Sequence, residues 1–295
     1  MQFSRKDFLK LSIPATGLLI LGGVPLLTPG LVKASPTSSL KGTRQALLYD
    51  SSKCIGCRAC ETACRRWNKL PPEHKPLELS TTSWTVIKSI ELNNSGKKEQ
   101  LFLKRQCMHC TEASCVAVCP TGAATHHGDY VVIDQEVCTG CGYCVEACPF
   151  DVPHREPPRG TARKCTFCVD RVTQGLKTAC AEACPVGAIL CGDRSELIAE
   201  GKTRVQVLSA NGNPDSHLYG ETELGGLGVM YILLKPASVY DLPEVPRQAT
   251  ANVFAQWASG IVTAGVLAVV PFWLFFKRRQ RIEEEKQSSI EGGAE

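Results

Sequence analysis

The sequence predicts an α+β fold in which two cysteine-built modules carry inserted β-hairpins and one C-terminal helix crosses a membrane. Three observations lead to this prediction. Sixteen of the seventeen cysteines fall into four tight groups, and residues 248–276 contain no charged side chain. Stretches between the groups alternate apolar and polar residues as half-buried strands do. A chain of 295 residues with 43% hydrophobic content can bury a core without disulfide staples, so the cysteines need a chemical explanation.

Residues 1–34 resemble an export signal. The stretch SRKDFLK precedes an apolar run, residues 11–32, that several prolines and glycines interrupt. The run ends at Val32-Lys33-Ala34, a small-residue cleavage signature. We interpret this segment as a twin-arginine signal peptide in which Lys6 replaces the second arginine; an uncleaved anchor or a Sec signal is the alternative. Residues 35–247 are then the folded domain that carries the cysteines.

The cysteine groups have the spacing of iron–sulfur ligands. The first and third groups read C-x2-C-x2-C-x3-C, the run found in bacterial ferredoxins, and the last three groups end in Cys-Pro. Three thiolates of such a loop bind one 4Fe–4S cluster, while the fourth binds the neighbouring cluster. We therefore predict two ferredoxin-like dicluster modules with four 4Fe–4S clusters and sixteen iron ligands. The groups are Cys54, Cys57, Cys60, Cys64; Cys107, Cys110, Cys115, Cys119; Cys138, Cys141, Cys144, Cys148; and Cys165, Cys168, Cys180, Cys184.

Zinc and disulfides are the alternatives for these cysteines. Zinc takes four ligands, commonly in two separated pairs, and does not require a third cysteine two residues after the second. Disulfides within a group would close loops too small to stabilise the fold. His109 lies in CMHC, but no CxxCH haem-attachment motif occurs. Cys191 lies outside the groups, and we predict that it is a small buried hydrophobic residue.

Local patterns predict the elements between the groups. Residues 81–92 and 97–105 predict two strands joined by the turn NNSG, and residues 124–134 predict a smaller hairpin turning at Gly128 and Asp129. Asp193 is a candidate cap for a helix over 195–209, in which Glu200 and Arg204 are four residues apart. Residues 217–234 predict a loop followed by a buried strand, with ELGGLG as a turn rather than a nucleotide site.

The C-terminal region predicts one membrane span and its orientation. Residues 248–276 are long enough to cross a bilayer as a helix, and Trp257 and Trp273 lie near its ends, as interfacial aromatic residues do. Lys277, Arg278, Arg279 and Arg281 follow directly. By the positive-inside rule the tail, residues 277–295, is cytoplasmic, so residues 35–247 lie on the periplasmic face.

The motifs resemble one known family. The stretches CMHC, CTGCGYCVEACPFDVP, KCTFCVDRV, ACPVGAI and GGLGVMYIL, with the C-terminal helix, are similar to the beta subunit of membrane-bound respiratory formate dehydrogenase. The iron–sulfur subunit of hydrogenase-2 type uptake hydrogenases is a close relative of that family. The resemblance implies how the cysteines share clusters: Cys54, Cys57, Cys60 with Cys184; Cys165, Cys168, Cys180 with Cys64; Cys107, Cys110, Cys115 with Cys148; and Cys138, Cys141, Cys144 with Cys119.

The resemblance also implies a function. The chain would be a non-catalytic subunit that carries electrons from a periplasmic catalytic subunit to a membrane cytochrome b or quinone-reactive subunit. The catalytic partner would be a molybdenum or tungsten formate dehydrogenase, or alternatively a [NiFe] hydrogenase. A stand-alone iron–sulfur reductase would need an open iron site or an added cofactor, for which the four complete groups leave no ligands.

Charge distribution adds two expectations. The net charge of +4 falls to about +1 once residues 1–34 are set aside, which predicts no nucleic-acid partner. Several cations flank cysteines in the sequence, where they would favour the more negative, reduced state of a cluster. Solvated surface charge or partner docking is the alternative role for each. These cations are Arg58, Arg65, Arg66, Lys104, Arg105, Arg163 and Lys164.

Overall fold

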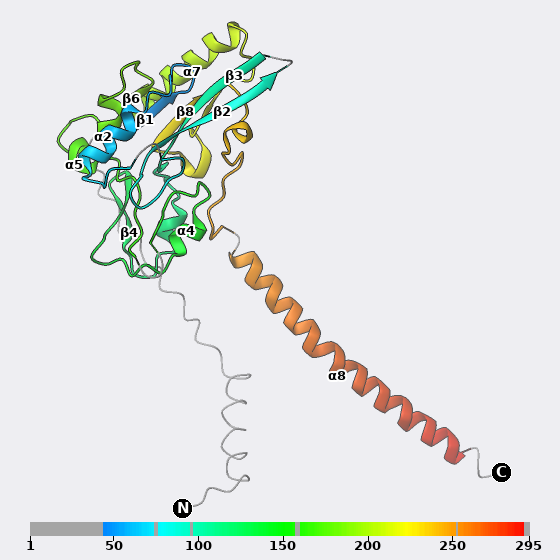
Figure 1. The fold of residues 1–295 in the computed structure, drawn as a ribbon. Helices are drawn as coiled ribbons and strands as arrows, with labels where there is room; N and C mark the ends of the chain where they lie inside the picture. The colour runs from blue at the N-terminus through cyan, green and yellow to red at the C-terminus, as the bar shows by residue number, and fades with distance from the viewer. Residues whose placement is uncertain (1–43, 74–75, 95–96, 157–159, 252, 292–295) are drawn as a thin grey trace, which may run out of the picture. The chain divides into compact units, whose positions relative to one another are not determined.

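The computed structural model describes residues 44–73, 76–94, 97–156, 160–251 and 253–291 (Figure 1). The predicted signal peptide, residues 1–34, lies outside the described residues.

A four-stranded mixed sheet joins the two ends of the cysteine-bearing region. Its strands are β1 (Gln45–Asp50), β6 (Ile189–Asp193), β7 (His217–Tyr219) and β8 (Val229–Leu233), in the order β6-β1-β8-β7. β1 runs antiparallel to β6 and parallel to β8, and β7 runs antiparallel to β8. The two central strands are almost completely buried, as expected for apolar runs covered on both faces.

The helix α7 (Arg194–Ala210) covers one face of this sheet. Asp193 caps it as predicted, because its Oδ1 accepts hydrogen bonds from the backbone N–H of Ser195 at 2.9 Å and of Glu196 at 3.2 Å. Arg204 makes its ion pair with the buried Asp50 of β1, with 3.0 Å between Nε and Oδ2, rather than with the residue one helical turn before it. The ion pair therefore fastens α7 to the sheet.

Alternate residues of the central strands point to different layers. Leu48 and Met230 pack with Leu197 and Leu208 of α7. The residues next to them in sequence, such as Tyr49 and Tyr231, point to the other face of the sheet. They belong to the larger core, which contains many of the cysteines. This period of two follows from strand geometry. The sheet thus forms a wall between α7 and the cysteine-bearing core.

Two further pairs of strands and several short helices complete this region. β2 (Val86–Asn94) pairs antiparallel with β3 (Lys97–Arg105), and β4 (Ala124–His127) pairs antiparallel with β5 (Tyr130–Ile133). The last three strands lie within the predicted ranges, whereas β2 begins later than predicted and continues into the first two residues of the predicted turn. The 3-10 helices are η1 (Glu223–Gly225) and η2 (Ala237–Tyr240). The short α-helices are α2 (Ala59–Trp67), α3 (Ser114–Ala117), α4 (Tyr143–Ala147), α5 (Val169–Val172) and α6 (Ala179–Glu182).

The C-terminal helix α8 (Val253–Glu291) is a single 39-residue element (Figure 1). Residues Trp257–Ile282 have a mean hydropathy of 2.0 and bury no surface against the rest of the chain. This stretch is long and apolar enough to span a membrane. The helix begins after the predicted start of the span, residue 248, and includes the first part of the predicted tail. Pro271 lies inside it, as membrane helices tolerate.

Candidate metal centres

Three cavities in the core are each lined by four cysteines. We name the groupings set A (Cys54, Cys57, Cys60, Cys184), set B (Cys64, Cys165, Cys168, Cys180) and set C (Cys107, Cys110, Cys115, Cys148). The empty volumes of the cavities are similar, about 300, 310 and 340 Å³ respectively. Each cavity therefore combines three cysteines from one sequence group with one cysteine from another.

The remaining four cysteines form set D (Cys119, Cys138, Cys141, Cys144). Burial raises the pKa of the Cys144 thiol to about 11, and the charges of the other three members contribute to the same shift. The other three therefore lie within electrostatic range of Cys144. Three of the four cysteine combinations that the resemblance implies therefore line a cavity each, and the fourth is seen as charge effects on Cys144.

Short helical turns connect neighbouring sets. Cys60 and Cys64 are four residues apart on α2, so they lie one above the other on the same face, yet Cys60 faces the cavity of set A and Cys64 that of set B. Cys180 and Cys184 are also four residues apart, and they line the cavities of set B and set A respectively. The helices α2 and α6 pack together, as do α3 and α4, which connect sets C and D. Each pair of helices therefore holds two sets side by side.

Charge effects link the sets in the order A, B, C, D. One cysteine of each of the first three sets has a pKa that the charge of a cysteine in the next set raises. The outer sets each contain one exposed cysteine, Cys57 in set A and Cys141 in set D, whereas no member of sets B and C is exposed. The linking pairs are Cys60 and Cys180, Cys165 and Cys107, and Cys115 and Cys144.

Hydrogen-bond donors point at several of the sulfur atoms. The backbone N–H of Ala124 donates to Cys119 Sγ at 3.3 Å, and that of Ala188 donates to Cys184 Sγ at 3.2 Å. These two bonds arise in the similar turns PTGAA and PVGAI that follow the Cys-Pro pairs. Such donors make the kind of hydrogen bond that stabilises a metal-bound sulfur ligand.

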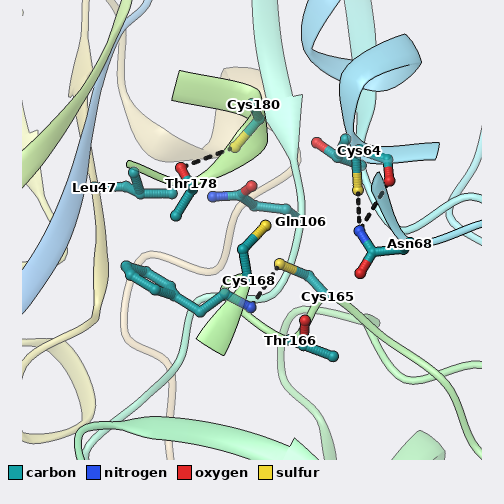
Figure 2. Close-up of a pocket in the computed structure, with 11 residues that line it drawn as sticks. Leu47, Cys64, Asn68, Gln106, Cys165, Thr166, Cys168, Thr178 and Cys180 are labelled. Atoms are coloured by element: carbon teal, nitrogen blue, oxygen red, sulfur yellow. Dashed lines mark hydrogen bonds between the residues drawn. The ribbon is translucent and has the colours of Figure 1, made fainter. Parts of the chain in front are cut away.

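The cavity of set B has further polar groups (Figure 2). Asn68 Nδ2 donates to Cys64 Sγ at 3.6 Å, and Thr178 Oγ1 lies 3.5 Å from Cys180 Sγ. The sequence analysis did not assign a role to Thr178 or to Gln106, which also lines this cavity. Gln106 approaches set B from a distant segment of the chain, whereas Thr178 lies only two residues before Cys180 and could have been noticed from the sequence.

The donor arrangement distinguishes a cluster from the alternatives. All seventeen cysteines lie among the described residues and none forms a disulfide. Within the same described residues, no three His, Cys, Asp or Glu side chains converge closely enough to hold a single metal ion. A 4Fe–4S cluster instead places one thiolate on each of four irons, around a body that separates the sulfurs. Four cysteines around a cavity fit this group and do not fit zinc.

The seven cations next to the cysteines differ in burial. Arg66 and Arg163 are exposed to solvent, and Arg58 and Arg65 are half-buried. Lys104, Arg105 and Lys164 are buried, with exposed fractions of 0%, 9% and 4%. The interpretation as solvated surface charge is therefore wrong for these three residues.

The buried cations have different partners. Arg105 donates to the carbonyl oxygen of Phe150 at 2.9 Å and lies 3.7 Å from a carboxylate oxygen of Asp241. Lys164 Nζ donates to the carbonyl oxygens of Val131 and, at 3.2 Å, of Cys165. Burial by itself lowers the pKa of Lys104, but the neighbouring thiolates, led by that of Cys180, outweigh this effect and raise it above its usual value.

Gly56, between the first two cysteines of set A, permits a close approach. Its φ is +68°, and a Cβ added there would lie 2.4 Å from Cε1 of Phe102 on β3. The left-handed backbone and the aromatic contact both exclude a side chain. The loop can therefore lie directly against β3.

We expect Gly56→Ala to destabilise the chain through both effects. The left-handed conformation costs an alanine about 1–3 kcal/mol, and overpacking against Phe102 costs about 1–3 kcal/mol more. Gly122→Ala is the matched control, since Gly122 has φ +70° but nothing within 4 Å of an added Cβ. Urea unfolding of the iron-loaded protein measures the difference. Equal losses for the two variants would show that the Phe102 contact has no effect.

Comparisons with known proteins agree with this site. Residues 53–123 and 98–194 each match a family model described as a 4Fe–4S dicluster domain. The matches and the cysteine-lined cavities define an iron–sulfur protein with two ferredoxin-type dicluster domains.

Three relatives extend the comparison. The nitrate-inducible formate dehydrogenase iron–sulfur subunit of Escherichia coli K12 is 37% identical over 84% of this chain and 92% of the relative. The formate dehydrogenase iron–sulfur subunit of Haemophilus influenzae is 36% identical over 75% of this chain and 78% of the relative. The hydrogenase-2 operon protein HybA of Escherichia coli O157:H7 is 32% identical over 84% and 86%. The chain belongs to the family of formate dehydrogenase iron–sulfur subunits.

Proposed function

We propose that this chain is the electron-transfer subunit of a respiratory formate dehydrogenase complex and holds four 4Fe–4S clusters in series. The observation that carries this proposal is the succession of four cysteine sets through the core, with exposed cysteines only in the two outer sets. The clusters would supply one-electron transfer when bound. No catalytic residue is proposed, because the sixteen grouped cysteines are all assigned as cluster ligands.

Sets A to D are the proposed ligands, one set for each cluster. The chain's own residues would fix the clusters and adjust their potentials. Backbone N–H groups such as those of Ala124 and Ala188 stabilise negative charge on the cysteine sulfurs. The apolar core excludes water from sets B and C. We also propose that the β2–β3 and β4–β5 pairs are insertions between the cysteine groups of the dicluster modules.

The outer sets are the proposed points of electron entry and exit. Exposed apolar side chains accompany both exposed cysteines: Ile55 beside Cys57 is 59% exposed, and Tyr143 beside Cys141 is 58% exposed. Such surfaces suit contact with partner subunits. The names of the relatives support a formate dehydrogenase as the donor, and we propose that it is a molybdenum or tungsten enzyme. The name of the relative HybA supports a hydrogenase as the second candidate, which we propose to be of the [NiFe] type.

The proposed location is the cytoplasmic membrane, with the cluster domain on its periplasmic face. Residues 248–276 would span the bilayer, and residues 277–295 would form the cytoplasmic tail, in accordance with the cluster of cations after the apolar stretch. Residues 1–34 would direct export by the twin-arginine route, which carries folded proteins with their cofactors. The acceptor would be a membrane cytochrome b or quinone-reactive subunit.

Anaerobic purification of the complex tests this function. We expect about sixteen iron atoms per chain, as four 4Fe–4S clusters require. Magnetic resonance of the dithionite-reduced sample should show four interacting paramagnetic centres. Molybdenum or tungsten in the co-purified catalytic subunit would identify formate as the electron source, whereas nickel would identify hydrogen. Stoichiometric zinc with little iron in this chain would contradict the proposal.

A further inference from the structure

Lys104 is a fully buried cation near two cysteine sets, because its hydrogen-bond partner Gln106 lines the cavity of set B and its strand partner Ile87 lines that of set A. It is the next-to-last residue of β3, and its side chain has an exposed fraction of 0%. The charges that act on it most strongly come from Cys180 and Cys165 of set B and Cys60 of set A. In turn, its charge acts on Cys64 and Cys168, the two other members of set B. The ammonium group therefore lies within electrostatic range of both sets.

This ammonium group has no ion-pair partner among the described residues. Its Nζ donates a hydrogen bond to Oε1 of Gln106, a neutral amide that lines the cavity of set B. Glu61 is close enough to feel the charge, but its carboxylate pairs with Arg58 at 3.5 Å. A fully buried charge without a counter-ion is strongly unfavourable. The counter-charge must therefore come from the cysteine sets and what they bind.

The position of Lys104 is fixed by its surroundings. Its backbone carbonyl accepts a hydrogen bond of 2.8 Å from the hydroxyl of Tyr231, and Lys104 is paired with Ile87 across the β2–β3 ladder. Lys164 is the comparable buried lysine elsewhere, but it donates to two carbonyl oxygens and acts on Cys115 and Cys148 of set C. The charge of Lys104 therefore acts on sets A and B, and that of Lys164 acts on set C.

We propose that Lys104 adjusts the reduction potentials of two clusters. Its fixed positive charge acts on the clusters of sets A and B and raises the potentials of both. The inference rests on the proposed function, because it requires clusters at these sets. Adding one electron to a cluster with four thiolate ligands adds one negative charge, which a nearby buried cation stabilises. Because both clusters feel the same cation, their reduction potentials stay similar. An electron can then pass between sets A and B without a large difference in potential.

Lys104→Met in the intact complex tests this proposal. The substitution keeps the length of the side chain and removes its charge. We expect the ratio of reduced to oxidised cluster at sets A and B to fall roughly tenfold at a fixed potential, which corresponds to about 59 mV for a one-electron centre. The signals of sets C and D should shift less. Redox titration followed by magnetic resonance measures the potentials, and iron analysis measures the number of clusters.

Lys98→Met is the matched control, because Lys98 lies on the same strand but is exposed; it should leave all four potentials unchanged. If Lys104→Met does not assemble, Lys104→Gln removes the charge while keeping a polar head group, and the same shift is expected. Unchanged potentials in an iron-replete Lys104 variant would overturn the role of Lys104 and leave the proposed function intact. A wild-type chain without clusters at sets A and B would overturn the proposed function itself.

Discussion

Replacing Cys64 with alanine is expected to remove the cluster of set B and to stop electron flow through the chain. Cys64 belongs to the first group in the sequence but lies in the cavity with Cys165, Cys168 and Cys180. Alanine offers no ligand for iron. Iron should therefore fall from about sixteen to about twelve atoms per chain. Since set B comes between sets A and C in the proposed series, formate-dependent quinone reduction should fall close to the assay background.

Cys191→Ala provides the control for this experiment. Cys191 is the seventeenth cysteine, lies on β6 paired with Leu47, and lines none of the three cysteine cavities. Its removal should leave both the iron content and the rate of quinone reduction unchanged. The spectrum of the Cys64→Ala protein should lack the signal that also disappears in a Cys168→Ala protein. Loss of the signal that Cys57→Ala removes would instead assign Cys64 to set A.

Leu267→Arg is expected to release the chain from the membrane when it is produced without its partners. Leu267 lies near the middle of the apolar stretch Trp257–Ile282 and is 71% exposed. An arginine at the centre of a membrane helix costs about 2.5–3.5 kcal/mol, which reduces insertion roughly a hundredfold. The measurement is the distribution of the chain between membrane and soluble fractions after a high-salt wash.

Leu267→Phe is the matched control, since it changes the shape of the side chain without adding charge. This variant should remain in the membrane fraction. The Leu267→Arg protein should keep its full iron content, because the cysteine sets lie outside α8. A Leu267→Arg chain that stays in the membrane to the same extent as Leu267→Phe would contradict a spanning role for α8.

Several elements were predictable because their signals are local. The β2–β3 pair, the β4–β5 pair and the buried β8 follow from alternation or apolar runs beside turn residues. Asp193 was recognised as the cap of α7 from its place before the helix. The apolar part of α8 follows from composition alone.

Other elements needed the folded chain. The strands β1, β6 and β7 were not predicted, because short apolar runs such as ALLY fit a buried strand and a buried helix equally well. β1 finds its parallel partner in β8, which lies far away in the sequence. Arg204 was expected to face a residue on its own helix, yet the buried carboxylate of Asp50 is the stronger partner because it lies in a less polar environment.

The sequence by itself determined the chemistry of this protein. Iron–sulfur ligation demands thiolates at fixed short intervals, so the four cysteine groups can be read without any knowledge of the fold. The tertiary structure decided the order of the sets and the burial of Lys104 near two of them. The physical reason is that both depend on contacts between segments distant in the chain. The alternation of buried and exposed residues along a strand does not hold at Lys104, because Leu103, Lys104 and Arg105 are all buried. This end of β3 is covered on both faces, which depends on the packing of the whole core.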